Sequence, residues 1–139
     1  MNNMNMNKMT IARILLVIAF LVSLISLSKT AGHLSEASYF LPALEEGPQH
    51  ARFHFLREIM GDLGAILIAM TVIFSPEKYR IKPMWWVLFI AVFFYYGAFW
   101  VGYPILGVGA PNLAAKTVHS LMTVFGFAGV LLAKSSFNQ

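Results

Sequence analysis

The stretch QHARFHFLREIMGDLGAILIAMTVIF, residues 49–74, decides how the chain is organised, because it turns from polar to apolar without a loop signal in between. The apolar half begins at Leu63. In the first half, polar side chains recur every four residues, at His50, His54, Glu58 and Asp62. Residues four apart on a helix are stacked neighbours, so the pattern predicts one helix with a polar stripe. The stripe turns by about 40° per step, so adjacent members can share a ligand while the ends diverge.

Composition places this chain in a membrane. Hydrophobic residues make up 58% of the 139 residues and charged residues only 12%, whereas soluble domains have about 45–50% and about 25%. We expect a single integral membrane domain, residues 1–139, in the cell membrane (the inner membrane in a Gram-negative cell). The net charge of +4 is small and spread along the chain, so we expect lipid as a partner and no nucleic acid. The absence of cysteine excludes disulfides, thiolate metal sites and cysteine nucleophiles.

Four apolar runs predict four transmembrane helices, at about residues 11–28, 49–75, 84–103 and 111–133, with an extracytoplasmic loop at 29–48. The first run is long for a signal peptide and no small-x-small cleavage site follows it, so we expect an uncleaved helix. Pro48 is a good first residue for the second helix, and Pro104 and Gly107 are expected to end the third. Only residues 63–75 of the second run are free of charge, about 20 Å of helix against a bilayer core of about 30 Å.

The distribution of Lys and Arg predicts the orientation. One side of the expected bundle collects Lys8, Arg13, Lys78, Arg80, Lys82 and Lys134, and the other only Lys29 and Lys116, with Arg52 and Arg57 inside a helix. The positive-inside rule then places both termini in the cytoplasm. The predicted fold class is all-α, a four-helix transmembrane bundle with both termini on the cytoplasmic side.

This topology gathers the titratable residues on the outer side. All four histidines and five of the six acidic residues are expected there: His33, His50, His54, His119, Glu36, Glu45, Glu46, Glu58 and Asp62. Ionisable groups inside a span are costly and mark a functional site by default. The convergence is therefore the strongest functional signal in the sequence.

The first functional hypothesis is a metal or haem site. The imidazoles of His50 and His54, with Glu58 one turn on and His119 across the bundle, offer ligands to a transition metal. His54 and His119 can alternatively ligate a haem. At 1.5 Å per residue these two histidines lie about 9 and 12 Å below their helix starts, so we predict that they meet.

The second hypothesis is a pocket for a sterol-like or quinone-like lipophile, with His54, Glu58 and Asp62 as catalytic proton carriers in an isomerase-type reaction. The third is an accessory subunit whose polar stripe pairs with a larger membrane complex, or with further copies in a homo-oligomer. Small size favours this third hypothesis, since four short spans leave little room for a complete enzyme. The polar stripe is expected to face the bundle interior, because a lipid-facing carboxylate costs a few kcal/mol.

Structural roles compete with each of these hypotheses. His50 and His54 can be interfacial residues without a ligand, and His119 a satisfied packing residue. Glu58 and Asp62 can belong to a salt-bridge network that holds the bundle together. The aromatic run at residues 93–100 is expected to face lipid or the core.

A family resemblance adds to this interpretation. The segment His50-Ala51-Arg52-Phe53-His54, after a proline-containing loop and before an apolar half-helix, resembles a motif of an uncharacterised family of small four-span membrane proteins. The order of spans also resembles DoxX-like proteins. The resemblance covers the layout and this pentapeptide; it implies the four-span fold and the importance of the two histidines, and no activity. The pair His54 and Glu58 is also similar to the sterol-isomerase type of bundle.

Overall fold

The structure, a computed structural model, describes residues 2–40 and 49–137. These residues form four long helices: α1 (Asn2–Gly32), α2 (His50–Ile73), α3 (Lys82–Leu106) and α4 (Leu113–Ala133). Short 3₁₀ turns follow three of them: η1 (Ala37–Tyr39), η2 (Glu77–Tyr79) and η3 (Lys134–Ser136). The described residues contain no strand, so the all-α prediction is confirmed. The predicted start of the second helix at Pro48 lies outside the described residues.

Three segments are long and apolar enough to cross a membrane: Lys8–Gly32, Lys82–Leu106 and Leu113–Ser136. They belong to α1, α3 and α4. The helix α2 is not among them, and its first half carries the charged residues Arg52, Arg57, Glu58 and Asp62. Large apolar side chains on these helices are exposed in the single chain, as lipid contact requires; Phe94 on α3 is 69% exposed.

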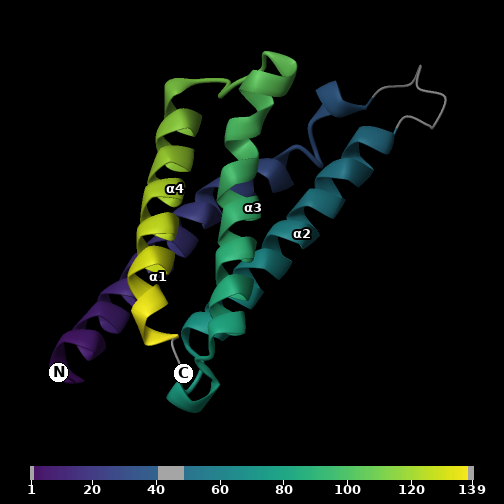
Figure 1. Ribbon diagram of the computed structural model, residues 1–139. Helices are drawn as coiled ribbons and strands as arrows, with labels where there is room; N and C mark the ends of the chain where they lie inside the picture. The colour runs from purple at the N-terminus through teal and green to yellow at the C-terminus, as the bar shows by residue number, and fades with distance from the viewer. Residues whose placement is uncertain (1, 41–48, 138–139) are drawn as a thin grey trace.

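Successive helices alternate in direction, and both ends of the chain lie at the same end of the bundle (Figure 1). We call this the inner end and the opposite one the outer end. The main packing pairs are α1 with α4, α2 with α3, α3 with α4 and α1 with α2. The helices α2 and α4 therefore occupy opposite corners of the bundle.

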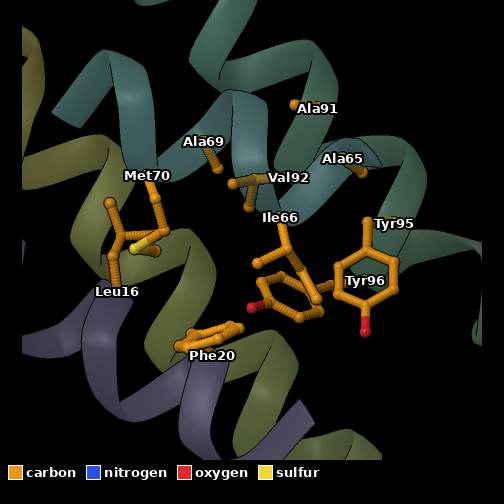
Figure 2. A pocket seen from close by; sticks show the side chains of 10 residues that line it. All are labelled: Leu16, Phe20, Ala65, Ile66, Ala69, Met70, Ala91, Val92, Tyr95 and Tyr96. Carbon is orange, nitrogen blue, oxygen red and sulfur yellow. The ribbon is translucent and has the colours of Figure 1, made fainter. Parts of the chain in front are cut away.

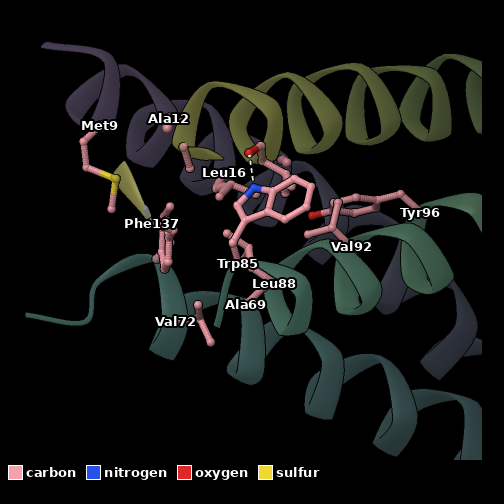
Figure 3. Packing of buried hydrophobic residues seen from close by; sticks show 14 of the residues in the cluster. Met9, Ala12, Leu16, Ala69, Val72, Trp85, Leu88, Val92, Tyr96 and Phe137 are labelled. Atoms are coloured by element: carbon pink, nitrogen blue, oxygen red, sulfur yellow. Dashed lines mark hydrogen bonds between the residues drawn. The ribbon is translucent and has the colours of Figure 1, made fainter. Parts of the chain in front are cut away.

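Among the described residues, the buried core lies in the inner half of the bundle. Figure 3 shows how its members pack together. These members recur at spacings of three and four residues, the period of a helix face that packs on another helix. They are Met9, Ala12, Leu16, Ala19, Ser23, Ile66, Ala69, Val72, Ile73, Trp85, Leu88, Val92, Tyr96, Met122, Gly126, Gly129, Val130, Ala133 and Phe137. No residue in the ranges 24–40, 49–65 and 97–121 is buried. The helices thus pack tightly in the inner half of the bundle and leave the outer half open.

Two glycines on α4 allow the close packing of the inner half. A Cβ atom built on Gly129 would lie 2.8 Å from Cγ of Leu16 and 3.0 Å from the backbone oxygen of Ala12, both on α1. A Cβ on Gly126 would overlap the ring of Tyr96 on α3. Small residues at such positions let membrane helices approach each other closely.

Polar contacts within the core join the helices. The indole of Trp85 donates a hydrogen bond to the backbone oxygen of Val130 at 3.0 Å (Figure 3). The Ser23 hydroxyl lies 2.7 Å from the backbone oxygen of Ala19 and 3.2 Å from the Tyr96 hydroxyl. Ser23 and Tyr96 are the last buried residues of α1 and α3 before the open half.

Basic groups cap the inner end. Arg13 donates to the backbone oxygen of Ile73 at 3.1 Å, and Arg80 donates to that of Ser75 at 3.0 Å. Burial, and then the neighbouring charge of Arg13, lower the pKa of Arg80. The carbonyl groups at the end of α2 thus have cationic donors, which suits the negative end of a helix dipole.

The third helix runs further than the sequence predicts. Pro104 lies inside α3, which continues to Leu106 and ends at Gly107. Gly107 adopts φ of 68°, a left-handed conformation that glycine accepts without strain, and its N–H donates to the oxygen of Tyr103 at 2.9 Å. The expectation that Pro104 ends the helix is therefore wrong.

Candidate functional site

The open outer half contains a cavity of about 480 Å³ between the end of α3 and the start of α4. This volume falls within the range of about 300–1,000 Å³ that is usual for small-molecule pockets. Aromatic rings, small loop residues and one cation line it: Phe99, Trp100, Tyr103, Pro104, Gly109, Ala110 and Lys116. A flat apolar molecule with a polar end is the kind of ligand that such a lining accommodates.

Two helix caps position the loop that borders this cavity, which is open to the surface. Gly107 ends α3 as described above, and Asn112 begins α4 by accepting a hydrogen bond from the backbone N–H of Ala115 at 2.9 Å. Asparagine at this position satisfies one of the unpaired N–H groups of a helix start. The short loop between the caps carries Gly109 and Ala110 of the lining.

His119 lies directly behind the cavity wall. Its ring stacks on Phe99 with a centroid separation of 3.6 Å and an interplanar angle of 7°. Its Nε2 lies 3.3 Å from the hydroxyl of Ser26 on α1. His119 thus connects α4 to both neighbouring helices, and its ring fixes the orientation of a cavity residue.

Trp100 is held by a second polar connection. Its indole N–H donates to the hydroxyl of Thr123 at 2.8 Å, and that hydroxyl donates to the backbone oxygen of His119 at 2.7 Å. This hydrogen bond orients the Trp100 ring, although the side chain is exposed in the single chain. Both large rings of the cavity, Phe99 and Trp100, are therefore positioned by residues of α4.

The histidines of α2 form a separate pair. Nε2 of His50 and Nε2 of His54 lie 2.8 Å apart, so one ring donates to the other. His54 and Glu58 are exposed, while His50 and Asp62 are half-buried. The prediction that the whole stripe faces the interior is wrong for His54 and Glu58, because the outer halves of the helices do not pack around them.

His33 belongs to a third group, at the junction of α1 and α2. Its Nδ1 lies 2.8 Å from Oε1 of Glu36, and its ring contacts those of Tyr39 and Phe55. Arg52 donates to the backbone oxygen of Glu36 at 3.2 Å. The Nε atom of Arg52 is buried without a hydrogen-bond partner among the residues that the structure describes. This group joins the start of α2 to the segment after α1; the predicted members Glu45 and Glu46 lie outside the described residues.

The structure does not assemble the predicted metal ligands. Within residues 2–40 and 49–137, no group of three or more His, Asp or Glu side chains could hold a metal ion. His50 and His54 contact each other on α2, whereas the contacts of His119 on α4 are with Ser26 and Phe99. The predicted meeting of His54 and His119 is wrong, because α2 and α4 stand at opposite corners of the bundle.

A second, much smaller gap lies in the bundle core. This gap of about 10 Å³ lies between α1, α2 and α3, and its lining is apolar (Figure 2). This volume is about that of one water probe, so the gap is a packing defect with no room for a cofactor.

The cavity is not apparent from the sequence. The pattern of basic residues predicts Lys116 as a topology determinant, and the aromatic run is expected to face lipid or the core. One signal was present, because Lys116 precedes His119 by three residues and so shares its helix face. None of the predicted catalytic residues His54, Glu58 and Asp62 is in the cavity lining.

Comparisons with known proteins bring no relative: no protein-family model, no curated protein and no solved structure matches the chain.

Proposed function

We propose that the protein is a four-span membrane protein that binds a planar lipophile, quinone-like or sterol-like, at the outer end of its bundle. The observation that carries the proposal is the cavity of about 480 Å³ with aromatic walls and a single cation, Lys116. Ligand pockets often lie between the helices of a bundle. Because a membrane helix satisfies its backbone polar groups internally, side chains decide the polarity of such a pocket, and apolar ones make it suitable for a lipid-soluble ligand.

The direction of the helices supports a fourth crossing by α2. The candidate spans α1 and α3 point the same way in Figure 1. The chain must therefore return across the bilayer between them, and α2 is the helix that runs back. Its 24 residues correspond to about 36 Å, enough for a bilayer core of about 30 Å. A core of that thickness takes about 20 of these residues, so Arg57, Glu58 and Asp62 then lie inside its outer part.

The basic residues support an orientation with the inner end in the cytoplasm. Lys8, Arg13, Arg80 and Lys134 lie at that end, close to both termini and to the turn between α2 and α3. The positive-inside rule relates such a cluster to the cytoplasmic face. The lipophile site then faces the outside of the cell membrane.

The lining defines what the ligand offers. Phe99 and Trp100 supply ring surfaces that stack on a planar molecule. The Lys116 ammonium donates hydrogen bonds and accepts none, so the polar end of the ligand carries an oxygen acceptor. Quinone carbonyls and a sterol hydroxyl both provide such an oxygen acceptor, and a fluorescence-quenching assay distinguishes the two classes of ligand. Proton transfer by His54, Glu58 or Asp62 stays a prediction of the sequence.

The metal hypothesis has less support than the lipophile. The pair His50 and His54 supplies two imidazoles on one helix turn, and zinc sites have four ligands or three and a water. The haem variant also needs a second axial ligand opposite His54, and His119 does not provide it.

Trp100 provides the test, because it is the one tryptophan in the cavity lining. A soluble quinone added to protein in detergent is expected to quench tryptophan fluorescence along a saturable curve. The saturable component should disappear in Trp100→Phe, since Trp85 and Trp86 lie about 21 Å or more away along α3. A brominated sterol in the same assay identifies the sterol alternative.

Lys116→Ala should raise the Kd of the ligand in this assay about tenfold, because the variant loses the binding free energy of one hydrogen bond from a charged donor. Lys29→Ala is the matched control, an exposed lysine at the same end of the bundle. Quenching that is unchanged in Trp100→Phe, or that never saturates with either probe, would contradict the proposal.

A further inference from the structure

One side of the outer part of α2 is largely exposed in the single chain. We define the α2 outer face as His54, Arg57, Glu58, Gly61, Gly64 and Ile68. At 100° per residue these positions fall within an arc of about 120°. All are exposed except Gly64, which is half-buried, and Ile68 is 47% exposed. In Figure 1 α2 forms one flank of the bundle.

The two glycines of this face pack against no neighbour among the described residues. A Cβ atom built on Gly61 or Gly64 would meet no heavy atom within 4 Å, whereas Gly126 and Gly129 are tightly enclosed. A glycine inside a helix costs about 1 kcal/mol relative to alanine. In membranes, small residues on a helix face let a second helix approach closely.

The charges of the face have no ionic partner among the described residues. Arg57 and Glu58 are exposed and form no ion pair there, and the Arg57 guanidinium lies 5.8 Å from the ring centroid of Phe53 on the same helix. Exposed apolar side chains lie on the same stretch of α2, Leu56 and Met60 among them. A charged side chain in contact with lipid is costly and usually finds a partner of opposite charge.

We propose that the α2 outer face binds the same face of a second copy of this chain, with the two α2 helices parallel and related by a two-fold axis along the membrane normal. The proposal rests on the membrane crossing by α2 and not on the lipophile. Gly61 and Gly64 line the contact, and Arg57 of each copy faces Glu58 of the other.

The charge pattern is what selects a second copy as the partner. Arg57 and Glu58 lie on opposite sides of Gly61, at about 40° and about 60° from it. A two-fold axis brings the left side of one helix against the right side of the other, so Arg57 meets the opposite charge at nearly equal depth. Both ion pairs form at once, and the face is complementary to itself.

Cross-linking tests the dimer directly, because the chain has no cysteine of its own. Ile68→Cys and His54→Cys are expected to give a disulfide-linked product of twice the chain mass on oxidation in native membranes. Ile90→Cys on α3, which is 51% exposed, is the matched control and should stay monomeric. Equal cross-linking at Ile90→Cys, no product at either α2 position, or a product with another protein's mass would overturn the proposal.

A charge exchange separates the ion pairs from simple proximity. In the Ile68→Cys background, Arg57→Glu and Glu58→Arg should each lower the cross-linked fraction at least threefold, because all four facing charges become alike. The combination of both substitutions should restore it. Gly61→Leu should abolish the cross-link while the monomer unfolds as before, since its side chain enters empty space. If the double exchange does not restore the cross-linked dimer, the two ion pairs do not form.

Discussion

Replacing Gly129 with leucine is expected to destabilise the bundle strongly. The Cβ atom alone would lie 3.0 Å from the backbone oxygen of Ala12 and 3.3 Å from the backbone nitrogen of Leu16. Backbone atoms of α1 cannot yield as a flexible side chain does, so α1 and α4 must separate. We expect a loss of about 3 kcal/mol in the free energy of unfolding, against a total of about 5–15 kcal/mol for most proteins.

Gly97→Leu on α3 is the matched control for this prediction, because a Cβ there meets nothing within 4 Å. We expect its stability to equal that of the unsubstituted chain or to exceed it by up to about 1 kcal/mol, the helix propensity that leucine adds. Denaturation in detergent micelles, followed by circular dichroism, measures both variants. A Gly129→Leu protein as stable as Gly97→Leu would mean that α1 and α4 do not pack as described.

Ala110→Trp is expected to abolish ligand binding without unfolding the bundle. Ala110 lies in the loop between α3 and α4, is half-buried and lines the outer cavity. An indole ring at this position fills the space beside Trp100 that the ligand needs. We expect at least a hundredfold rise in Kd for the quinone or sterol probe, measured by displacement of radiolabelled ligand so that the added tryptophan does not interfere.

The control places the same substitution just outside the cavity. Ala114 is exposed on the first turn of α4 and is not in the lining, so Ala114→Trp should bind as the unsubstituted chain does. Equal binding by both variants would mean that the ligand lies elsewhere in the protein.

The sequence predicted the helices well because their signals are local. Apolar runs, and the glycine at position 107 that ends α3, depend on residues close together in the chain. Pro104 was misread for a related reason. It lies in the last turn of α3, where the missing N–H is tolerated, and the left-handed Gly107 ends the helix instead.

The candidate site was less predictable, because it depends on how each helix is rotated and on which helices are neighbours. Equal depth for His54 and His119 followed from counting residues, but α2 and α4 do not adjoin, and His119 turns towards Ser26 and Phe99. The open outer half was also invisible in the sequence. Nothing local distinguishes Phe99, outside the core, from Val92, which is buried within it.

The central claim is that a lipophile occupies the outer cavity against Lys116. Native mass spectrometry of the protein released from its own membranes tests this claim most directly. We predict one bound molecule with the mass of a quinone or a sterol on the unsubstituted chain and on Ala114→Trp, and its absence from Ala110→Trp. The same bound mass on Ala110→Trp, or no bound lipophile on any of the three proteins, would contradict the account.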